Sequence, residues 1–535
     1  MSQPNRETED ATHRPDADGS AAPAGAVEPP AAKNGVVVPA AATKPSLSRL
    51  FTNATVYGIG QFFSNLIGLV TGPILSYLLT RADFGLLGVT RSVNNMLTAF
   101  YRLGLDGAAG RLHIDAEHDH DLARRTAATL NTFVLVWAGS LTVVQELVGP
   151  PLYDRFLPGI PYRVFGRFIS FALFCDALTA IPLAVWGAQE KARRIVGLKI
   201  LSSLLSNALV FGLLLGTNLG VMSIFWAGVA GPLLMLQFYL RFSWGTYGFA
   251  WDTAVLKKAL AFGLPMVVHL TSHWVLDAAD RLMLDSYLGR ESVGLYTVAY
   301  GAVGTLITIN LSINGGFVPQ VTRAHEKPEQ RQFVADAVTY FLASAAAATL
   351  AFVSLSSTSI RLFYAAKFEE AAGLSPILCV GPFFHAVYLV YVNGLFFKKR
   401  TTLIPIATVL AGATNVGLNA LLIPRIGIRG AAWATLAGYA TLAFLFRIAC
   451  NLVTTIPFDR GRLARVFVPL GVLTAAAWLV DGRLPLWIEV FVKLALVGAG
   501  LPALWLSGFL GPKERAYLRE RVDTFLVKLR LKKKK

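Results

Sequence analysis

The second of several long apolar segments in the sequence carries a stripe of polar and charged side chains. The stripe consists of Arg91, Asn94, Asn95, Thr98, Arg102 and Asp106. At 3.6 residues per turn these positions fall within about 120° of one helical face, and a face of this kind cannot point into lipid. A guanidinium group binds phosphate through a planar fork and keeps its charge when partly desolvated. We therefore predict that Arg91, Asn95 and Arg102 bind an anionic substrate group such as a pyrophosphate.

A structural explanation for the same side chains stays open. Arg102 can pair with Asp106 one helical turn further on, and the long side chain of Arg91 can reach the membrane interface. Four more ionisable residues stand singly in or near apolar segments, and each can pair locally or extend to the interface in the same way. They are Asp176, His385, Arg447 and Lys493. We keep Asp176 and Asp106 as candidates for ion or proton coupling.

A second group of titratable side chains occupies the apolar segment around residues 259–280. The group consists of His269, His273, Asp277 and Asp280. These residues spread over roughly 80° of one helical face, and Pro265 can bend the helix beneath them. Histidines and partly buried carboxylates can change charge during a transport cycle, so the group predicts proton or ion coupling. Two histidines at i, i+4 also occur in metal sites, but no third ligand is nearby in the sequence. A helix that only hydrogen-bonds to its neighbours is the remaining alternative.

Residues 113–121 (His-Ile-Asp-Ala-Glu-His-Asp-His-Asp) gather oxygen and imidazole ligands and include an Asp-x-Asp motif. The motif is typical of metal and sugar-nucleotide sites, which require a walled pocket. No globular domain surrounds this segment, so we interpret it as a solvated cytoplasmic loop. The three cysteines, Cys175, Cys379 and Cys450, have no metal-binding or redox spacing and are interpreted as packing residues. We therefore expect no metal and no cofactor.

The composition identifies the environment of these residues. The chain has 535 residues, of which 54% are hydrophobic and 15% charged, and its mean hydropathy is +0.53. This is more apolar side chain than a water-facing surface can carry, so the sequence predicts an all-α integral membrane protein. The formal net charge of +17 does not predict nucleic-acid binding, because the basic residues lie in short connections between apolar segments.

The apolar segments are long enough to cross a hydrocarbon core of about 30 Å. We count about fourteen spans. They cover approximately residues 51–79, 86–108, 126–149, 164–187, 194–217, 220–240, 259–280, 292–318, 333–357, 372–397, 401–423, 428–451, 463–481 and 485–509. Before them, residues 1–44 have the composition of a disordered tail. After them, residues 511–535 predict a basic amphipathic helix on anionic lipid.

The basic residues predict the orientation. Positive charge is concentrated in alternate connections, which should face the cytoplasm. These connections contain Arg111/Arg124/Arg125, Lys191/Arg193/Arg194, Arg241/Lys257/Lys258, Arg323/Lys327/Arg331, Lys398/Lys399/Arg400 and Arg460/Arg462/Arg465. With an even number of spans and no cleavable signal peptide, both termini are expected in the cytoplasm.

An internal repeat divides the spans into two halves. The segment Leu79–Leu86 (LTRADFGL) recurs as Leu288–Leu295 (LGRESVGL), and Gly220, Trp226 and Gly231 recur as Gly427, Trp433 and Gly438. The offsets are 209 and 207 residues. Because about six spans separate equivalent elements, the halves should be parallel and related by an axis along the membrane normal. We predict lobes at 45–243 and 252–452, with two accessory spans at 460–510 and a transport cleft between the lobes.

Five short motifs stand out in the sequence: Ala82-Asp83-Phe84-Gly85-Leu86, Gly263-Leu264-Pro265, Asp280-Arg281, Val293-Gly294-Leu295-Tyr296 and Gly427–Ala432. With these motifs the sequence resembles the polysaccharide, or Wzx-type, flippases of the MOP superfamily. The resemblance covers roughly residues 48–510. It implies two six-helix lobes in a V-shaped arrangement with two extra C-terminal helices. It also implies alternating access for an undecaprenyl-pyrophosphate-linked oligosaccharide, the repeat unit of an O-antigen, capsule or exopolysaccharide.

A protein of this kind belongs in the bacterial cytoplasmic membrane, is driven by a proton or sodium gradient or the membrane potential, and meets a polysaccharide polymerase or chain-length machinery. We expect it to be a monomer. Two transporters remain as alternatives, a MATE-like drug or cation antiporter and a peptidoglycan lipid-precursor flippase. A membrane polymerase or ligase is more remote, because external connections of about 4 to 15 residues are too short to fold as a catalytic domain.

Overall fold

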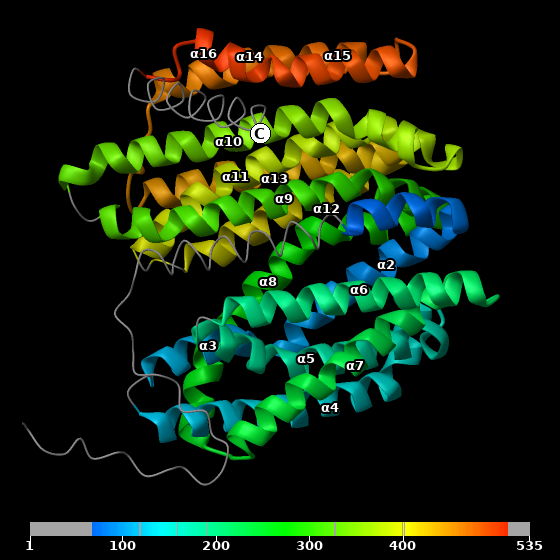
Figure 1. Cartoon of the computed structure of the whole chain (residues 1–535), viewed down its shortest axis with the longest axis vertical. Helices are drawn as coiled ribbons and strands as arrows, with labels where there is room; N and C mark the ends of the chain where they lie inside the picture. The colour runs from blue at the N-terminus through cyan, green and yellow to red at the C-terminus, as the bar shows by residue number, and fades with distance from the viewer. Residues whose placement is uncertain are drawn as a thin grey trace, which may run out of the picture. The chain divides into compact units, whose positions relative to one another are not determined.

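The apolar segments form long helices (Figure 1). The structure, a computed structural model, describes residues 67–511 apart from 117–118, 158, 190, 326–327, 399 and 401. Its α-helices are Ile67–Leu78, α2 (Arg81–Arg102), α3 (Leu105–Asp115), α4 (His120–Phe156), α5 (Arg167–Ala188), α6 (Ala192–Gly216), α7 (Met222–Tyr247), α8 (Thr253–Leu288), α9 (Arg290–His325), α10 (Arg331–Phe363), α11 (Ser375–Phe397), α12 (Leu403–Ile426), α13 (Ile428–Asn451), α14 (Arg460–Val480), α15 (Leu486–Gly498) and α16 (Gly500–Leu506). Short helices of other types are η1 (Tyr162–Gly166), η2 (Pro328–Gln330) and η3 (Ala366–Gly373).

The predicted fold class is confirmed. Ten helices in the described part are long and apolar enough to cross a membrane. Each of the fourteen predicted spans overlaps a helix in this part of the chain. Ten of them overlap these long apolar helices, and the other four overlap the helix Ile67–Leu78, α2, α7 and α8. The predicted tail at 1–44 and nearly all of the predicted helix at 511–535 lie outside the described residues.

The second predicted span differs from the structure. We expected one helix over 86–108, but α2 ends at Arg102 and α3 begins at Leu105. Leu103 and Gly104 between them have φ angles of 48° and 65°. A Cβ on Gly263 of α8 would lie 2.2 Å from the carbonyl oxygen of Leu103, so the break is where α8 packs directly on the backbone. Asp106 consequently lies in the first turn of α3, not on α2.

The helices pack as two bundles. In the first, α5 packs against α3, α4 and α7, and α6 packs against α7; in the second, α11 packs against α9, α10 and α13, and α12 packs against α13. Helix α8 belongs to both, because it contacts α3 in the first bundle and α12 in the second, and Figure 1 shows it running obliquely between them. All of these helices belong to one contact unit, residues 44–535. The exact lobe boundaries stay predictions.

Among the described residues, the hydrophobic core that the two bundles share lies at one end. The shared core includes Phe84 and Val89 of α2 together with Val293 of α9 and Phe368 of η3. Further along α2 and α9, the side chains join separate cores, one within each bundle. The bundles are therefore bound together where α2 and α9 begin.

The contact between α2 and α9 follows the internal repeat. A Cβ on Gly85 would lie 1.9 Å from the carbonyl oxygen of Arg290, and a Cβ on Gly294 would lie 2.0 Å from the carbonyl oxygen of Arg81. Gly294 and Arg290 each stand 209 residues after Gly85 and Arg81. The start of α2 thus packs against the start of α9, which is its counterpart in the internal repeat, as in a two-fold symmetric interface. Glycine at both positions permits the two backbones to approach this closely.

Helices α14 and α15 join the second bundle through a buried ionic network. Lys493 of α15 donates hydrogen bonds to Asp481 (2.5 Å) and Glu489 (2.7 Å), and Arg361 of α10 pairs with the same two carboxylates at 3.4 and 3.1 Å. Burial opposes ionisation of Asp481, but hydrogen bonds from Lys493 and Ser357 outweigh it and lower the pKa of this carboxyl group. Lys493, which we had interpreted as a lone charge, is part of a balanced set of two cations and two anions.

The glycine contact gives a prediction on stability. Gly294→Ala should lower the free energy of unfolding by about 1 to 3 kcal/mol, because the new methyl group forces α2 and α9 apart. The matched control is Gly301→Ala in the same helix, where a Cβ meets nothing within 4 Å. Denaturant unfolding of both variants in detergent measures the difference. Equal stability of the two variants would contradict the close contact.

Candidate functional site

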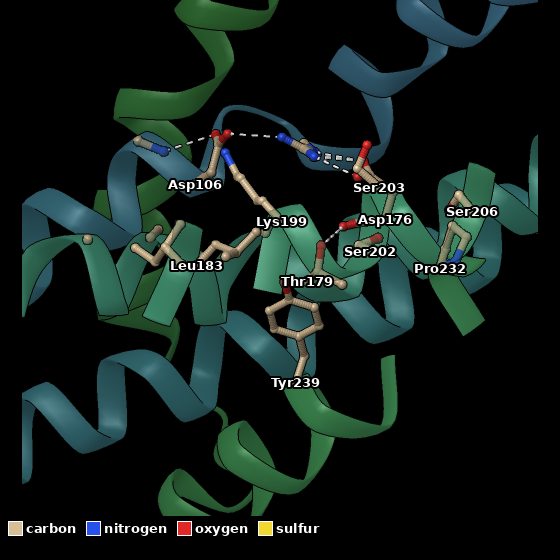
Figure 2. Close-up of a pocket in the computed structure, with 16 residues that line it drawn as sticks. Asp106, Asp176, Thr179, Leu183, Lys199, Ser202, Ser203, Ser206, Pro232 and Tyr239 are labelled. Carbon is tan, nitrogen blue, oxygen red and sulfur yellow. Dashed lines mark hydrogen bonds and ion pairs between the residues drawn. The ribbon is translucent and has the colours of Figure 1, made fainter. Parts of the chain in front are cut away.

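A cavity of about 660 Å³ lies inside the first bundle (Figure 2). Its wall comes from α2 and α3, from α5, from α6 and from α7. The charged residues that line it are Arg102, Asp106, Asp176 and Lys199, and the hydroxyl-bearing ones are Thr179, Ser202, Ser203, Ser206 and Tyr239. The volume is in the range of small-ligand pockets, which is roughly 300 to 1,000 Å³. The cavity therefore offers a polar ligand both charges and hydroxyl groups.

Arg102 is held by two carboxylates in this cavity. Its guanidinium group donates to both oxygens of Asp176, with distances of 2.7 to 3.1 Å. Asp106 lies 3.5 Å from the same group. The pair of Arg102 with Asp106, which the sequence offered as a structural explanation, is thus present. The main partner of Arg102 is nevertheless Asp176, which lies 74 residues away on α5. A phosphate would have to compete with Asp176 for Arg102, and the assignment of Arg102 to a substrate stays a prediction.

Lys199 also lines this cavity, and we did not select it from the sequence. It extends from α6 into the cavity, as Figure 2 shows, and makes no hydrogen bond or ion pair within the described residues. The sequence could have indicated Lys199 as a candidate, because it is an ionisable residue inside the apolar span predicted at 194–217. With Lys199, the cavity contains two cations and two carboxylates.

Asp280, predicted as a coupling residue, is fully buried where α8 meets the second bundle. Its carboxylate accepts hydrogen bonds from the hydroxyl groups of Tyr296 (2.5 Å) and Thr435 (3.2 Å) and from the backbone N–H of Arg281 (2.7 Å). Tyr296 belongs to α9 and Thr435 to α13. A carboxylate shared by three helices is placed to transmit a change of charge to their packing. Its role in coupling stays a prediction.

The other members of the predicted group lie on α8, but the side chains of His269, His273 and Asp277 are outside the described part of the structure. Segment 113–121, expected as a loop, is mostly helical. His113 and Asp115 belong to the end of α3, and α4 begins at His120 with Asp119 as its N-cap. Of the acidic residues that the structure describes here, Asp115 ends α3, Asp119 caps α4 and Asp121 lies in the first turn of α4. No group of three or more potential metal ligands occurs among the described residues.

Arg91 lies at the crossing of α2 and α8. The next residue, Ser92, accepts a hydrogen bond from the indole N–H of Trp274 on α8 (2.6 Å). Arg91 is accessible to solvent but closely surrounded by protein, and it is subject to the positive charge of Arg281. Within the described residues Arg91 makes no hydrogen bond or ion pair. Asn95, one turn further along α2, is exposed.

Arg281 is the second cation of this region, and the sequence had indicated it only as part of a family motif. Its guanidinium group stacks 4.3 Å from the centre of the Tyr300 ring and lies 3.5 Å from Asp280. Arg91 lies on α2 and Arg281 on α8, and Asp280 is a described carboxylate that pairs with Arg281. Arg91 is thus the arginine of this pair that makes no hydrogen bond or ion pair within the described residues.

A helical membrane fold with these features has relatives among known proteins. The model of a family described as "Polysaccharide biosynthesis protein" matches residues 50–325, about half of the chain. The chain belongs to this family. A curated relative, the "Probable low-salt glycan biosynthesis flippase Agl15" of Haloferax volcanii, is 22% identical over 187 residues, which are 34% of this chain and 40% of the relative. The match thus spans less than half of that flippase.

Two solved structures have a similar fold. The "Lipid II flippase MurJ, inward closed conformation" aligns with a TM-score of 0.66 and 14% identity, over 83% of this chain and 98% of MurJ. An inward-facing "multidrug resistance MATE family transporter of the MOP superfamily" aligns with a TM-score of 0.64 and 15% identity, over 75% of this chain and 97% of the other. The resemblance to the polysaccharide biosynthesis family is confirmed by the family match, and the two aligned structures, a lipid flippase and a drug transporter, share the fold. At these identities the alignments concern the fold alone.

The environment of Asp280 leads to a prediction on coupling. Asp280→Asn keeps the size of the side chain but removes its charge and replaces one acceptor oxygen by an amide N–H donor, so transport should lose its response to an imposed proton or sodium gradient while the protein stays folded. Asp154→Asn, an exposed position, is the control. Transport by the protein reconstituted in vesicles, over a range of gradients, measures the effect. A wild-type response of Asp280→Asn would show that the residue is structural.

Proposed function

We propose that the protein flips an undecaprenyl-pyrophosphate-linked oligosaccharide, the repeat unit of a surface polysaccharide, across the bacterial cytoplasmic membrane by ion-coupled alternating access. No bond of the cargo is made or broken in this process. Membership of the polysaccharide biosynthesis family and the fold of lipid and drug transporters support a transported cargo. The glycan-flippase relative supports a lipid-linked sugar.

The proposal rests on the positive charge of Arg91 at the crossing of α2 and α8. A cation within a membrane protein is costly unless an anion neutralises it, by about 2.5 to 3.5 kcal/mol on insertion scales. Arg91 has no such partner in the described part of the chain. A pyrophosphate entering between α2 and α8 would supply the missing negative charge and match the fork of a guanidinium group.

Alternating access is consistent with the distribution of the cores. The bundles share a core where α2 and α9 begin and have separate cores further along. By the predicted orientation the shared end faces outward, and the end with separate cores faces the cytoplasm, where the cargo is made. The described arrangement would then accept cargo from the cytoplasm, and release would require the outer contact to open.

The carboxylates are assigned to energy coupling. Asp280 on α8 accepts hydrogen bonds from α9 and α13 of the second bundle, and α8 also contacts the first bundle, so a change in the charge of Asp280 would act where the bundles join. Asp106 and Asp176 hold Arg102 in the cavity of the first bundle, where Lys199 would balance a change in their charge. The driving ion is a proton or sodium. Interaction with anionic lipid, contact with a polymerase and a monomeric state remain part of the same proposal.

The alternatives differ in the cargo they require. A drug or cation antiporter would favour an anionic binding region over the positive charge of Arg91. A peptidoglycan-precursor flippase would need the same positive charge, and only the glycan distinguishes it. Family membership favours the polysaccharide substrate.

Binding of the pyrophosphate is the direct test of the proposal. Arg91→Ala should weaken binding of undecaprenyl pyrophosphate by roughly ten- to hundredfold, which corresponds to a lost charge-assisted contact of about 1.5 to 3 kcal/mol. Arg91→Lys should retain part of the affinity, because it keeps the charge but loses the fork. Titration of the purified protein in nanodiscs measures both variants.

Two controls make the result specific. Arg111→Ala removes an arginine of α3 whose side chain is mostly exposed, and it should not change the affinity. Undecaprenol, which has the same chain without phosphate, should bind equally to the wild type and to Arg91→Ala. Unchanged pyrophosphate affinity in Arg91→Ala would refute the assignment of the head group.

A further inference from the structure

Two arginines cross between the bundles where α2 and α9 begin. Arg81, the first residue of α2, donates from Nε to the carbonyl oxygen of Lys367 in η3 of the second bundle, and its guanidinium group lies 3.8 Å from Glu370. Arg290, the first residue of α9, donates to the carbonyl oxygen of Gly159 in the first bundle at 3.5 Å. Each bundle therefore binds the backbone of the other through one arginine.

The two contacts are equivalent under the internal repeat. Arg290 stands 209 residues after Arg81. Gly159 lies between α4 and α5, and Lys367 lies between α10 and α11, which are the corresponding connections of the two bundles. The glycine contacts between Gly85 and Gly294 follow the same offset. The arrangement is thus a two-fold related pair of contacts around the α2–α9 crossing, not a single chance interaction.

The arginine contacts differ in kind from the glycine contact between them. Backbone atoms in van der Waals contact fix how closely α2 and α9 pack, whereas a charged hydrogen bond to a carbonyl group depends on one side chain and can be exchanged for water. Asp285 holds the guanidinium group of Arg290 with two hydrogen bonds of 3.0 Å, which preserves its direction. The side chains can release without unfolding a helix.

We propose that Arg81 and Arg290 form a symmetric latch that keeps this end of the two bundles closed, and that both must release before the bundles part here. The proposal deepens the proposed function, because it identifies the contacts that would control release of cargo. Removing one arginine should weaken closure, and removing both should weaken it further.

Distances between the bundles test the latch without any cargo. Spin labels on Arg163→Cys in η1 and Glu369→Cys in η3, both exposed positions, report the separation at this end. The three native cysteines are buried and are replaced by alanine in the background. Pulsed electron paramagnetic resonance in nanodiscs gives the ratio of open to closed populations. The labelled parent should show mainly the short distance.

The latch variants are Arg81→Ala and Arg290→Ala, the latter with Asp285→Asn so that no carboxylate is left unpaired. Each should raise the ratio of open to closed populations by about fivefold, the lower end of ordinary coupling, and both together should raise it further. Arg155→Ala, which removes an exposed arginine on the same side of the first bundle, should leave the ratio unchanged. Glu370→Gln removes only the ion pair with Arg81 and should give a smaller rise.

Unchanged distances in the folded double variant, or an equal change in Arg155→Ala, would overturn the latch. If the arginine variants fold poorly, the milder Glu370→Gln decides, since its distances must still move toward the open population. Glycan-lipid transport by the same proteins separates the two ideas. If the variants show open distances but the parent does not transport glycan-lipid, the flippase proposal is refuted and the latch stands. If the parent transports glycan-lipid but the variants show unchanged distances, the latch is refuted and the flippase proposal stands.

Discussion

The contact between Gly85 and Gly294 is the constraint on which the rest of the structure depends. Each glycine lies against the backbone of the helix that carries the other, so the backbones of α2 and α9 meet directly at this crossing. The shared core forms around this crossing, and the cores of the two bundles separate beyond it. Because the interface joins a surface to its own repeat, one short motif specifies both sides of it. Movement of the bundles must therefore open or pivot about this crossing.

The charged residues divide into two kinds by their partners. Arg361, Asp481, Glu489 and Lys493 neutralise one another and attach the C-terminal helices to α10, which is a structural use of buried charge. Arg102 is likewise held by Asp176 and Asp106. Arg91 is different, because no described residue neutralises it and a second arginine lies near it. This difference between paired and unpaired cations is the reason for placing an anionic cargo at Arg91.

Local patterns in the sequence predicted the helices, the repeat and the candidate charged residues. Features that depend on contacts between residues far apart in the sequence could not be predicted in this way. Arg102 was matched with Asp106 because i, i+4 pairs can be read from spacing, whereas Asp176 becomes its partner only when α5 packs against α2. The break at Leu103 could not be expected, since leucine rarely adopts a positive φ angle and the close approach of Gly263 causes it. The repeat of Gly85 as Gly294 was visible, but not that the two copies touch.

The most direct test of the account is transport with the α2–α9 end fixed. The Oγ atom of Ser76 lies 2.9 Å from the backbone nitrogen of Ala365, so Ser76→Cys with Ala365→Cys can join the bundles beside the crossing by a disulfide. Flipping of undecaprenyl-pyrophosphate oligosaccharide in vesicles is then measured before and after reduction of the same protein. If the outer contact opens in each cycle, flipping should stop while the disulfide is intact and recover on reduction. Equal flipping in both states would contradict an outer contact that opens in each cycle.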